Sequence, residues 1–194
     1  LPTPAELGVD IAVGEGQPLG MPLSFGGPYL GFIACKKEMM RRLPGRIAGQ
    51  TVDADGKRCY VLTLQAREQH IRREKALSSV CSNQALCALT ATVYLAAMGP
   101  NGLREAAEQC YSKAHYAAEK LAEAGFGRVH EGAFFHEFVT SCPADVDALI
   151  DRLEAEGILG GLPVEGGILW CCTEMNTKEE MDRLAEICRE VAGA

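Results

Sequence analysis

The sequence predicts a mixed α/β to α+β fold. Two short apolar strands near the start enclose a loop rich in glycine and proline, and an Asp-Gly turn separates two further β-prone runs. The last third reads strand, helix, strand, strand, helix. With 194 residues, of which 47% are hydrophobic, the chain is long enough to bury a sizeable core.

Composition excludes several classes of protein. The net charge of −7 argues against a nucleic-acid partner. No apolar run approaches the roughly 20 residues that span a membrane, and no signal-peptide pattern opens the sequence. The nine cysteines include no C-x-x-C, so we expect neither a disulfide scaffold nor a metal site, but mostly buried free thiols in a cytoplasmic protein. A redox role for an exposed thiol stays open.

The first strand, GVDIAV, leads into the segment 14–35, GEGQPLGMPLSFGGPYLGFIAC, which ends in the second strand. Its six glycines and three prolines indicate a loop shaped by its backbone. Gly26 and Gly27 would let the backbone approach an anionic ligand with free N–H groups. The alternative is an ordinary connecting loop, and no nucleotide-binding motif is present.

The next elements are a short helix or turn over KKEMMRRLP and a hairpin. GRIAGQTV and RCYVLTLQ flank Asp53-Ala54-Asp55-Gly56, a strong turn signal. A calcium loop that began at Asp53 would need ligands at Lys57 and Leu64, so we expect a turn and no ion.

Charged residues crowd the segment AREQHIRREK. Its basic side chains, Arg67, His70, Arg72 and Arg73, could gather at a phosphate or carboxylate. Glu68 and Glu74 lie among them, which equally suits a solvated surface with local ion pairs.

Two helices follow. SNQALCALTATVYLAAM is apolar on nearly all sides, which predicts a buried helix with Ser82 as N-cap. Gly99-Pro100 ends it and opens a long amphipathic helix that stops at Gly125. His115 lies beside the apolar stripe of this helix, and we interpret it as structural.

The remainder predicts a compact β-α-β-β-α unit: a strand over AFFHEFVT, a helix opened by Pro143 and closed by Gly157, two strands over ILGGLPV and GGILWCCTE, and a last helix. Thr177 and Glu180 form a capping box for the last helix. Trp170 is expected in the core, and Cys171 and Cys172 are expected on opposite faces of a strand.

The runs GEGQPLGMPLSFGGPYLGFIACKKE, LPGRIAGQTVDADGKR and LTLQAREQHIRREK strongly resemble the first (alpha) subunit of two-subunit glycine dehydrogenase (decarboxylating), the P-protein of the glycine cleavage system. The resemblance implies the C-terminal part of a pyridoxal-phosphate (PLP)-dependent transferase of the aspartate-aminotransferase-like fold type I. Residues 1–80 would end its large domain, 81–124 would connect, and 125–194 would form a small C-terminal domain. The family decarboxylates glycine with PLP and passes the aminomethyl group to the lipoyl arm of a carrier protein.

The resemblance also implies that this chain lacks the cofactor lysine. Alignment on Pro22 places Gln17 at the Schiff-base position and Gly16 at the preceding histidine, and no lysine occurs in residues 1–35. The cofactor would then belong to the second, catalytic subunit, with Arg67 to Arg73 near its active site and no catalytic residue in this chain, which alone is expected to be inactive. The alternatives are a non-catalytic scaffold for a partner subunit and a self-sufficient PLP enzyme such as an aminotransferase.

Overall fold

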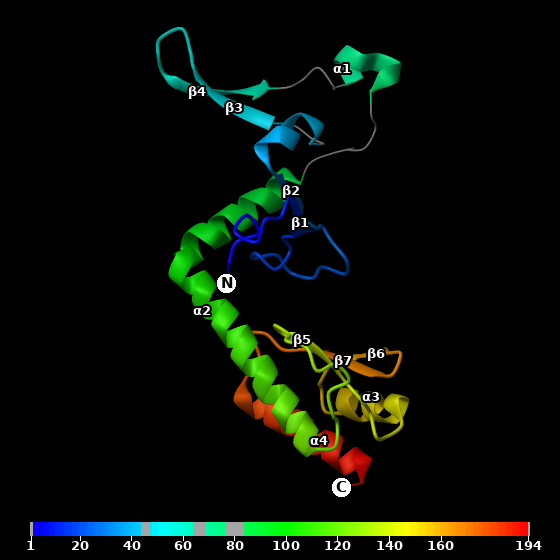
Figure 1. The fold of residues 1–194 in the computed structure, drawn as a ribbon. Coiled ribbons are helices and arrows are strands. Elements are labelled where there is room, and N and C mark those ends of the chain that lie inside the picture. Colours follow the sequence, from blue (N-terminus) through cyan, green and yellow to red (C-terminus); the bar gives the residue numbers. More distant parts are fainter. Residues whose placement is uncertain (1, 44–46, 64–68, 77–83, 194) are drawn as a thin grey trace. The chain divides into compact units, whose positions relative to one another are not determined.

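The computed structural model describes residues 2–43, 47–63, 69–76 and 84–193, except for the side chains of residues 69 and 70. The chain divides into two compact units, Leu1–Ala97 and Met98–Ala194, each with its own strands (Figure 1). Both units contain helices and strands, as the predicted mixed fold requires.

The first unit is built around two separate hairpins. Strands β1 (Ile11–Glu15) and β2 (Gly31–Cys35) pair antiparallel, and so do β3 (Ile47–Val52) and β4 (Arg58–Thr63). The short helical elements are η1 (Lys37–Arg42), α1 (Gln69–Arg72) and η3 (Arg73–Lys75).

The predicted turn between β3 and β4 is confirmed. A carboxylate oxygen of Asp53 accepts hydrogen bonds from the backbone N–H groups of Asp55 and Lys57, both at 2.9 Å. Gly56 takes the left-handed conformation that the turn requires, at φ +76°. The carboxylate of Asp53 thus stabilises the turn through its own backbone hydrogen bonds.

Helix α2 (Ala85–Glu123) runs through both units and is bent at Gly99, whose φ of +62° and ψ of −179° are not helical. The bend coincides with the predicted break at Gly99-Pro100, where proline removes a helical hydrogen bond. Ser82, the predicted N-cap, lies outside the described residues. Gly125 follows the helix at φ +92°, as expected of a terminating glycine.

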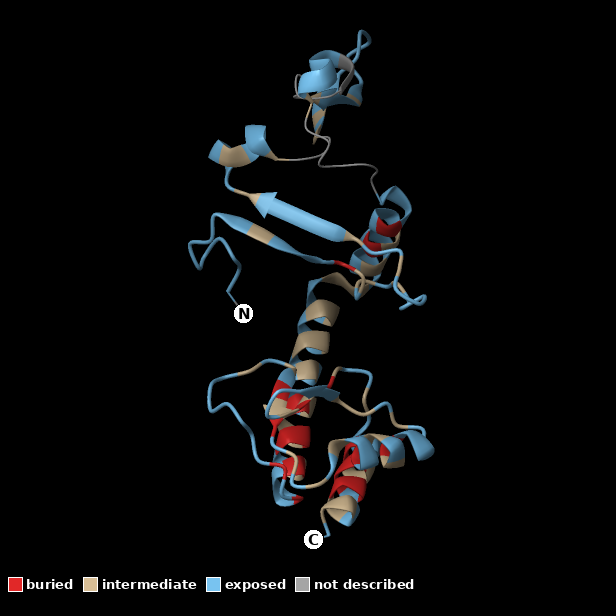
Figure 2. Ribbon diagram, turned by 90° about the vertical axis from the view of Figure 1, so that its right-hand side faces the viewer, coloured by how far each residue is buried: buried red, intermediate tan, exposed pale blue. Residues whose placement is uncertain are grey.

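The first unit has almost no core (Figure 2). Among its described apolar residues only Cys87 and Ala91 are buried. The prediction that the first part of α2 is buried is wrong for this chain: Leu86, Leu89 and Val93 are 76%, 58% and 61% exposed. The helix is apolar as predicted, but no described residue of this chain covers its side chains Leu86, Leu89 and Val93.

By length and composition alone, α2 also meets a test for a membrane span, with an 18-residue window of mean hydropathy 1.2. The sequence-based statement that no segment approaches such a span therefore needs correction. The same test is passed by core helices of water-soluble proteins.

The second unit has a core formed by helices on one sheet. Strands β5 (Glu137–Thr140), β6 (Leu162–Val164) and β7 (Gly167–Cys171) form an antiparallel sheet in the order β5-β7-β6. Helices α3 (Val146–Ala155) and α4 (Lys178–Ala192) complete the predicted strand-helix-strand-strand-helix order. The largest fully buried apolar side chains are Phe126, Leu121, Leu149, Leu153, Ile168, Ile187 and Cys188.

Local signals place both helices. Thr177 and Glu180 form the predicted capping box of α4. Helix α3 begins after Asp145, whose carboxylate accepts from the backbone N–H of Ala148 at 2.8 Å. Pro143 therefore precedes the cap and does not itself open the helix, which corrects the prediction.

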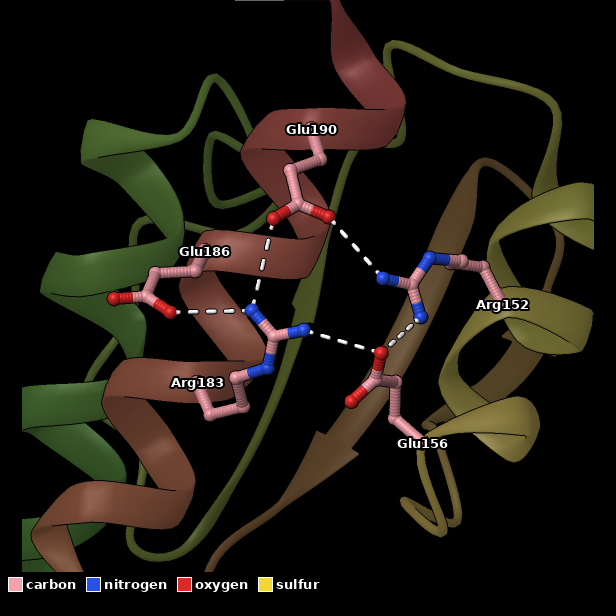
Figure 3. Close-up of polar contacts among 5 residues, drawn as sticks. All are labelled: Arg152, Glu156, Arg183, Glu186 and Glu190. Atoms are coloured by element: carbon pink, nitrogen blue, oxygen red, sulfur yellow. Dashed lines mark hydrogen bonds and ion pairs between the residues drawn. The ribbon is translucent and has the colours of Figure 1, made fainter.

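An ion-pair network joins α3 to α4 (Figure 3). Arg183 contacts Glu156, Glu186 and Glu190, at 3.1, 3.2 and 3.6 Å. Arg152 contacts Glu156 at 2.6 Å and Glu190 at 3.3 Å. The hydrogen bonds from Arg152 and then Arg183 hold the pKa of Glu156 below its usual range.

Candidate functional site

The glycine-rich loop connects β1 to β2 and is closed at its base by Glu15. One carboxylate oxygen of Glu15 accepts from the backbone N–H groups of Gln17 at 3.0 Å and Leu30 at 2.5 Å. The N–H of Gly16 donates to the carbonyl oxygen of Leu30 at 2.7 Å. These bonds fix where the loop leaves one strand and enters the next.

Gln17 lies within the loop, and its side chain forms hydrogen bonds with other residues of the loop. Its side-chain nitrogen Nε2 donates to the carbonyl oxygens of Pro22, at 2.9 Å, and Leu23, at 3.3 Å. The amide group can form these two bonds because it carries two N–H donors. Gln17 therefore has a structural role in the described chain, at the position where the resemblance places a Schiff-base lysine.

Gly16, at the position of the family's histidine, is buried and closely packed. A Cβ atom there would lie 3.1 Å from Cδ2 and 3.2 Å from the carbonyl oxygen of Leu30. The present loop conformation has little room for any side chain at this position.

Gly26 and Gly27 satisfy the conformational part of the prediction, with φ of +100° and +156°. The expectation that their N–H groups are free is wrong for Gly26, whose N–H donates to the carbonyl oxygen of Leu23 at 3.1 Å. The N–H of Gly26 is therefore already hydrogen-bonded within the loop and is not available to an anionic ligand.

Lys36, one of the two lysines nearest to the loop in sequence, lies at the other end of the hairpin. Its Nζ forms an ion pair with Asp10 at 2.5 Å, just beyond the Ile11–Cys35 pair. Five residue pairs of antiparallel strand, roughly 17 Å, separate that end from the loop. Lys36 therefore does not take the place of the missing lysine, and Lys37 begins η1 as an exposed residue.

The predicted basic cluster is only partly described. Arg67 and the side chain of His70 lie outside the described residues. Arg72 ends α1 and Arg73 begins η3, and both are exposed. Arg73 has a left-handed backbone, φ +52°. A common anion site of the four residues stays a prediction.

The eight described cysteines are free thiols, as predicted. Only Cys87, Cys172 and Cys188 are buried, so the prediction that most are buried is wrong. Burial raises the pKa of Cys188 to about 12. Cys171 is exposed and Cys172 buried, as expected for neighbours on opposite faces of a strand.

The second unit contains three side chains of kinds that can bind a metal ion, and the sequence alone did not predict that they lie close together. The donor atoms of His136, Glu137 and Cys171 all lie within 4.8 Å of one another. Glu137 and Cys171 are directly opposite in the β5–β7 ladder. They are 34 positions apart in sequence, and only the strand register, which spacing does not reveal, brings them together.

Comparison with known proteins decides the family. The model of the family described as glycine cleavage system P-protein matches residues 1–188. The chain belongs to the glycine cleavage system P-protein family. The resemblance seen in the sequence is thereby confirmed.

Relatives in this P-protein family have a consistent name. A probable glycine dehydrogenase (decarboxylating) subunit 1 of Moorella thermoacetica is 55% identical over 98% of this chain and 45% of its own length. Its counterpart in Desulfitobacterium hafniense is 52% identical over 95% of this chain and 43% of its own length. The chain thus spans less than half the length of these P-protein relatives.

A solved P-protein has the same fold. The crystal structure of a glycine decarboxylase (P-protein) of the glycine cleavage system, in inhibitor-bound form, is 44% identical and covers 98% of this chain and 45% of its own. The TM-score is 0.92.

Proposed function

We propose that this chain belongs to the non-Schiff-base subunit of a glycine-decarboxylating enzyme, and that a second subunit supplies the lysine that holds PLP. The observation that carries the proposal is Gln17, whose Nε2 bonds to two loop carbonyls at the position expected for that lysine. A carboxamide is not a nucleophilic amine. The loop residues therefore do not fit a covalently held PLP, and we assign no step of the cofactor chemistry to this chain.

The proposal includes the partners that the resemblance implies: the second subunit and a lipoyl carrier protein that accepts the aminomethyl group. In it, residues 1–80 end the large domain, 81–124 connect, and 125–194 form the small domain. The free thiols support a location in the reducing cytoplasm.

The assignment of the cofactor is tested by borohydride reduction. The chain is incubated with PLP, alone and together with the second subunit, reduced, digested and searched for pyridoxyl peptides by mass spectrometry. We expect no stoichiometric adduct on this chain and one on the second subunit. A stoichiometric adduct on a single lysine of this chain would overturn the proposal.

The segment with Arg67, His70, Arg72 and Arg73 is proposed to lie near the active site of the partner. Arg72 and Arg73 are exposed, as such a role requires. Replacing Arg67 and Arg73 with alanine is expected to slow turnover of the assembled enzyme. Unchanged rates in the double variant, with normal assembly, would exclude this role.

A second candidate is a non-catalytic scaffold for the partner subunit. Its support is the exposed apolar surface of the first unit, including Leu86, Leu89 and Val93 of α2. The activity of the second subunit, measured with and without this chain, distinguishes the two candidates. Full activity without this chain favours the scaffold. Activity that appears only on addition of this chain favours the enzyme subunit.

A further inference from the structure

The face of the second unit's sheet that carries Glu137 and Cys171 is distinct from its core face. Phe138 and Trp170 are paired across β5 and β7 and are buried, at 5% and 3% exposure. Side chains alternate between the faces of a strand. The preceding position in β5 and the following one in β7, Glu137 and Cys171, therefore project together from the opposite face, where both are exposed.

His136 completes the group, and its ring carries an unsatisfied atom. Nδ1 of His136 is buried and has no hydrogen-bond partner among the described residues. A buried polar atom without a partner is unfavourable and indicates a missing ligand, ion or water. The ring of Phe135 packs edge-on against the imidazole at 5.0 Å between ring centres. The backbone of His136 is fixed to the next strand by a hydrogen bond from the N–H of Cys172 to its carbonyl oxygen at 3.1 Å.

The three donors form a set with a clear chemical preference. An imidazole nitrogen, a carboxylate oxygen and a thiolate sulfur suit a borderline ion such as Zn²⁺, whereas Mg²⁺ and Ca²⁺ prefer oxygen alone. Bonds of about 2.0–2.3 Å to zinc place tetrahedral ligands roughly 3.5 Å apart. The donor atoms lie within 4.8 Å of one another, and small rotamer changes of the exposed Glu137 and Cys171 would bring them to that spacing.

We propose that His136, Glu137 and Cys171 bind one divalent transition-metal ion, with Zn²⁺ as the preferred ion. Three protein ligands leave the fourth tetrahedral position open. Glu137 and Cys171 also line a hollow of about 630 Å³ whose other walls include Ile158, Leu162 and Leu169. A solvent molecule or a small ligand from this hollow can occupy the open position. The three ligands belong to the second unit and the glycine-rich loop to the first, so the proposal does not depend on where PLP is held.

Cys110 is a neighbour of Cys171 and is not one of the three proposed ligands. The Sγ of Cys110 donates to a carboxylate oxygen of Glu174 at 3.2 Å, and Lys113 donates to the carbonyl oxygen of Glu174 at 2.5 Å. We therefore assign Cys110 as a neighbour of the metal ligands that is already hydrogen-bonded.

The test uses Co²⁺ as a spectroscopic probe of the 194-residue chain, followed by displacement with Zn²⁺. We expect one Co²⁺ per chain, a thiolate-to-cobalt charge-transfer band and the intense visible bands of a tetrahedral ion. C171S should abolish the charge-transfer band, and H136Q and E137Q should each weaken binding by about tenfold or more. Mg²⁺ should not displace the probe.

Each variant has a matched control that removes the same functional group elsewhere. C59S, H130Q and E131Q replace partly or fully exposed residues outside the group, and C110S replaces the neighbouring thiol. All four should bind within about threefold of the unchanged chain, with the same far-ultraviolet circular dichroism. Absence of the charge-transfer band in the unchanged chain, its persistence in C171S, or an equal loss in C110S would overturn the proposal.

Discussion

The indole nitrogen of Trp170 donates a hydrogen bond of 2.8 Å to the hydroxyl oxygen of Thr140 inside the core of the second unit. Thr140 is fully buried and Trp170 is 3% exposed. The bond runs diagonally across the β5–β7 ladder, because Thr140 is paired with Ile168 and Trp170 with Phe138. It allows a large aromatic side chain to be buried without leaving its N–H unpaired.

Replacing Thr140 with valine removes the acceptor and keeps the shape. We expect T140V to lower the free energy of unfolding of the second unit by about 1–3 kcal/mol, because the indole N–H is then buried without a partner. Trp170 is the single tryptophan, so its fluorescence during urea unfolding reports this unit. T92V, at an exposed position of α2, is the control. Equal unfolding midpoints for T140V and the unchanged chain would refute the prediction.

Gly166, in the β6–β7 turn, and Gly167, the first residue of β7, should differ in their tolerance of alanine. A Cβ at Gly167 would lie 1.9 Å from the carbonyl oxygen of Thr140, so G167A must push β7 away from β5. Gly166 has open space but a φ of +84°. We expect G166A to cost about 1 kcal/mol through backbone strain and G167A to cost more, as in overpacked cores. Urea unfolding measures both, and the reverse order would contradict this account.

The side chains of the α3–α4 ion-pair network are each at least about a third exposed, so the contribution of the network to stability should be small and sensitive to salt. R183M should lower the free energy of unfolding of the second unit less than T140V does. At high salt, R183M and the unchanged chain should be equally stable. The control is R104M, at an exposed position of α2. A loss that is undiminished by salt would indicate a packing role for Arg183.

The same network makes a prediction about pH. The pKa of Glu156 is lowered from 4.5 by its hydrogen bonds to Arg152 and then Arg183. A carboxylate with a depressed folded-state pKa contributes stability above its unfolded value, and that contribution is lost as the pH falls through the folded value. E156Q should therefore narrow the stability difference between neutral and acidic pH, with E131Q as the exposed control. Parallel pH profiles of E156Q and the unchanged chain would be inconsistent with this linkage.

The loop bonds of Gln17 should control how readily proteases reach residues 18–28. Q17E replaces two N–H donors with a carboxylate that faces two carbonyl oxygens, so we expect faster cleavage within this segment. Q50E, at an exposed position of β3, introduces the same charge in another hairpin. Limited proteolysis with peptide mapping compares the two, and identical cleavage patterns would show that the Gln17 bonds do not hold the loop.

Local signals were read correctly from the sequence. Asp53 and Gly56 form their turn from neighbouring atoms, and the capping box of Thr177 and Glu180 depends only on residues three positions apart. The burial of Trp170 follows from the apolar pattern of its strand. The turn and the capping box could be predicted because the residues that form them are neighbours in sequence.

Features that depend on distant partners could not be read in this way. Leu86 and Leu89 are apolar but exposed, since burial requires a surface to pack against. The candidate metal site depends on the register that places Cys171 opposite Glu137. In the loop, the sequence shows that Gln17 is not a lysine, but only the fold shows which carbonyl oxygens its amide binds.

The uneven burial of the two units has a consequence for the life of the protein in a cell. The second unit has the core of a self-supporting domain, whereas the first exposes apolar side chains such as Val13, Phe25 and Leu86. Proteases and chaperones recognise extended apolar segments of this kind. In the assembly proposed above, the first unit would be the part by which quality control distinguishes an unassembled copy, so this proposal predicts that the abundance of the chain follows that of its second subunit.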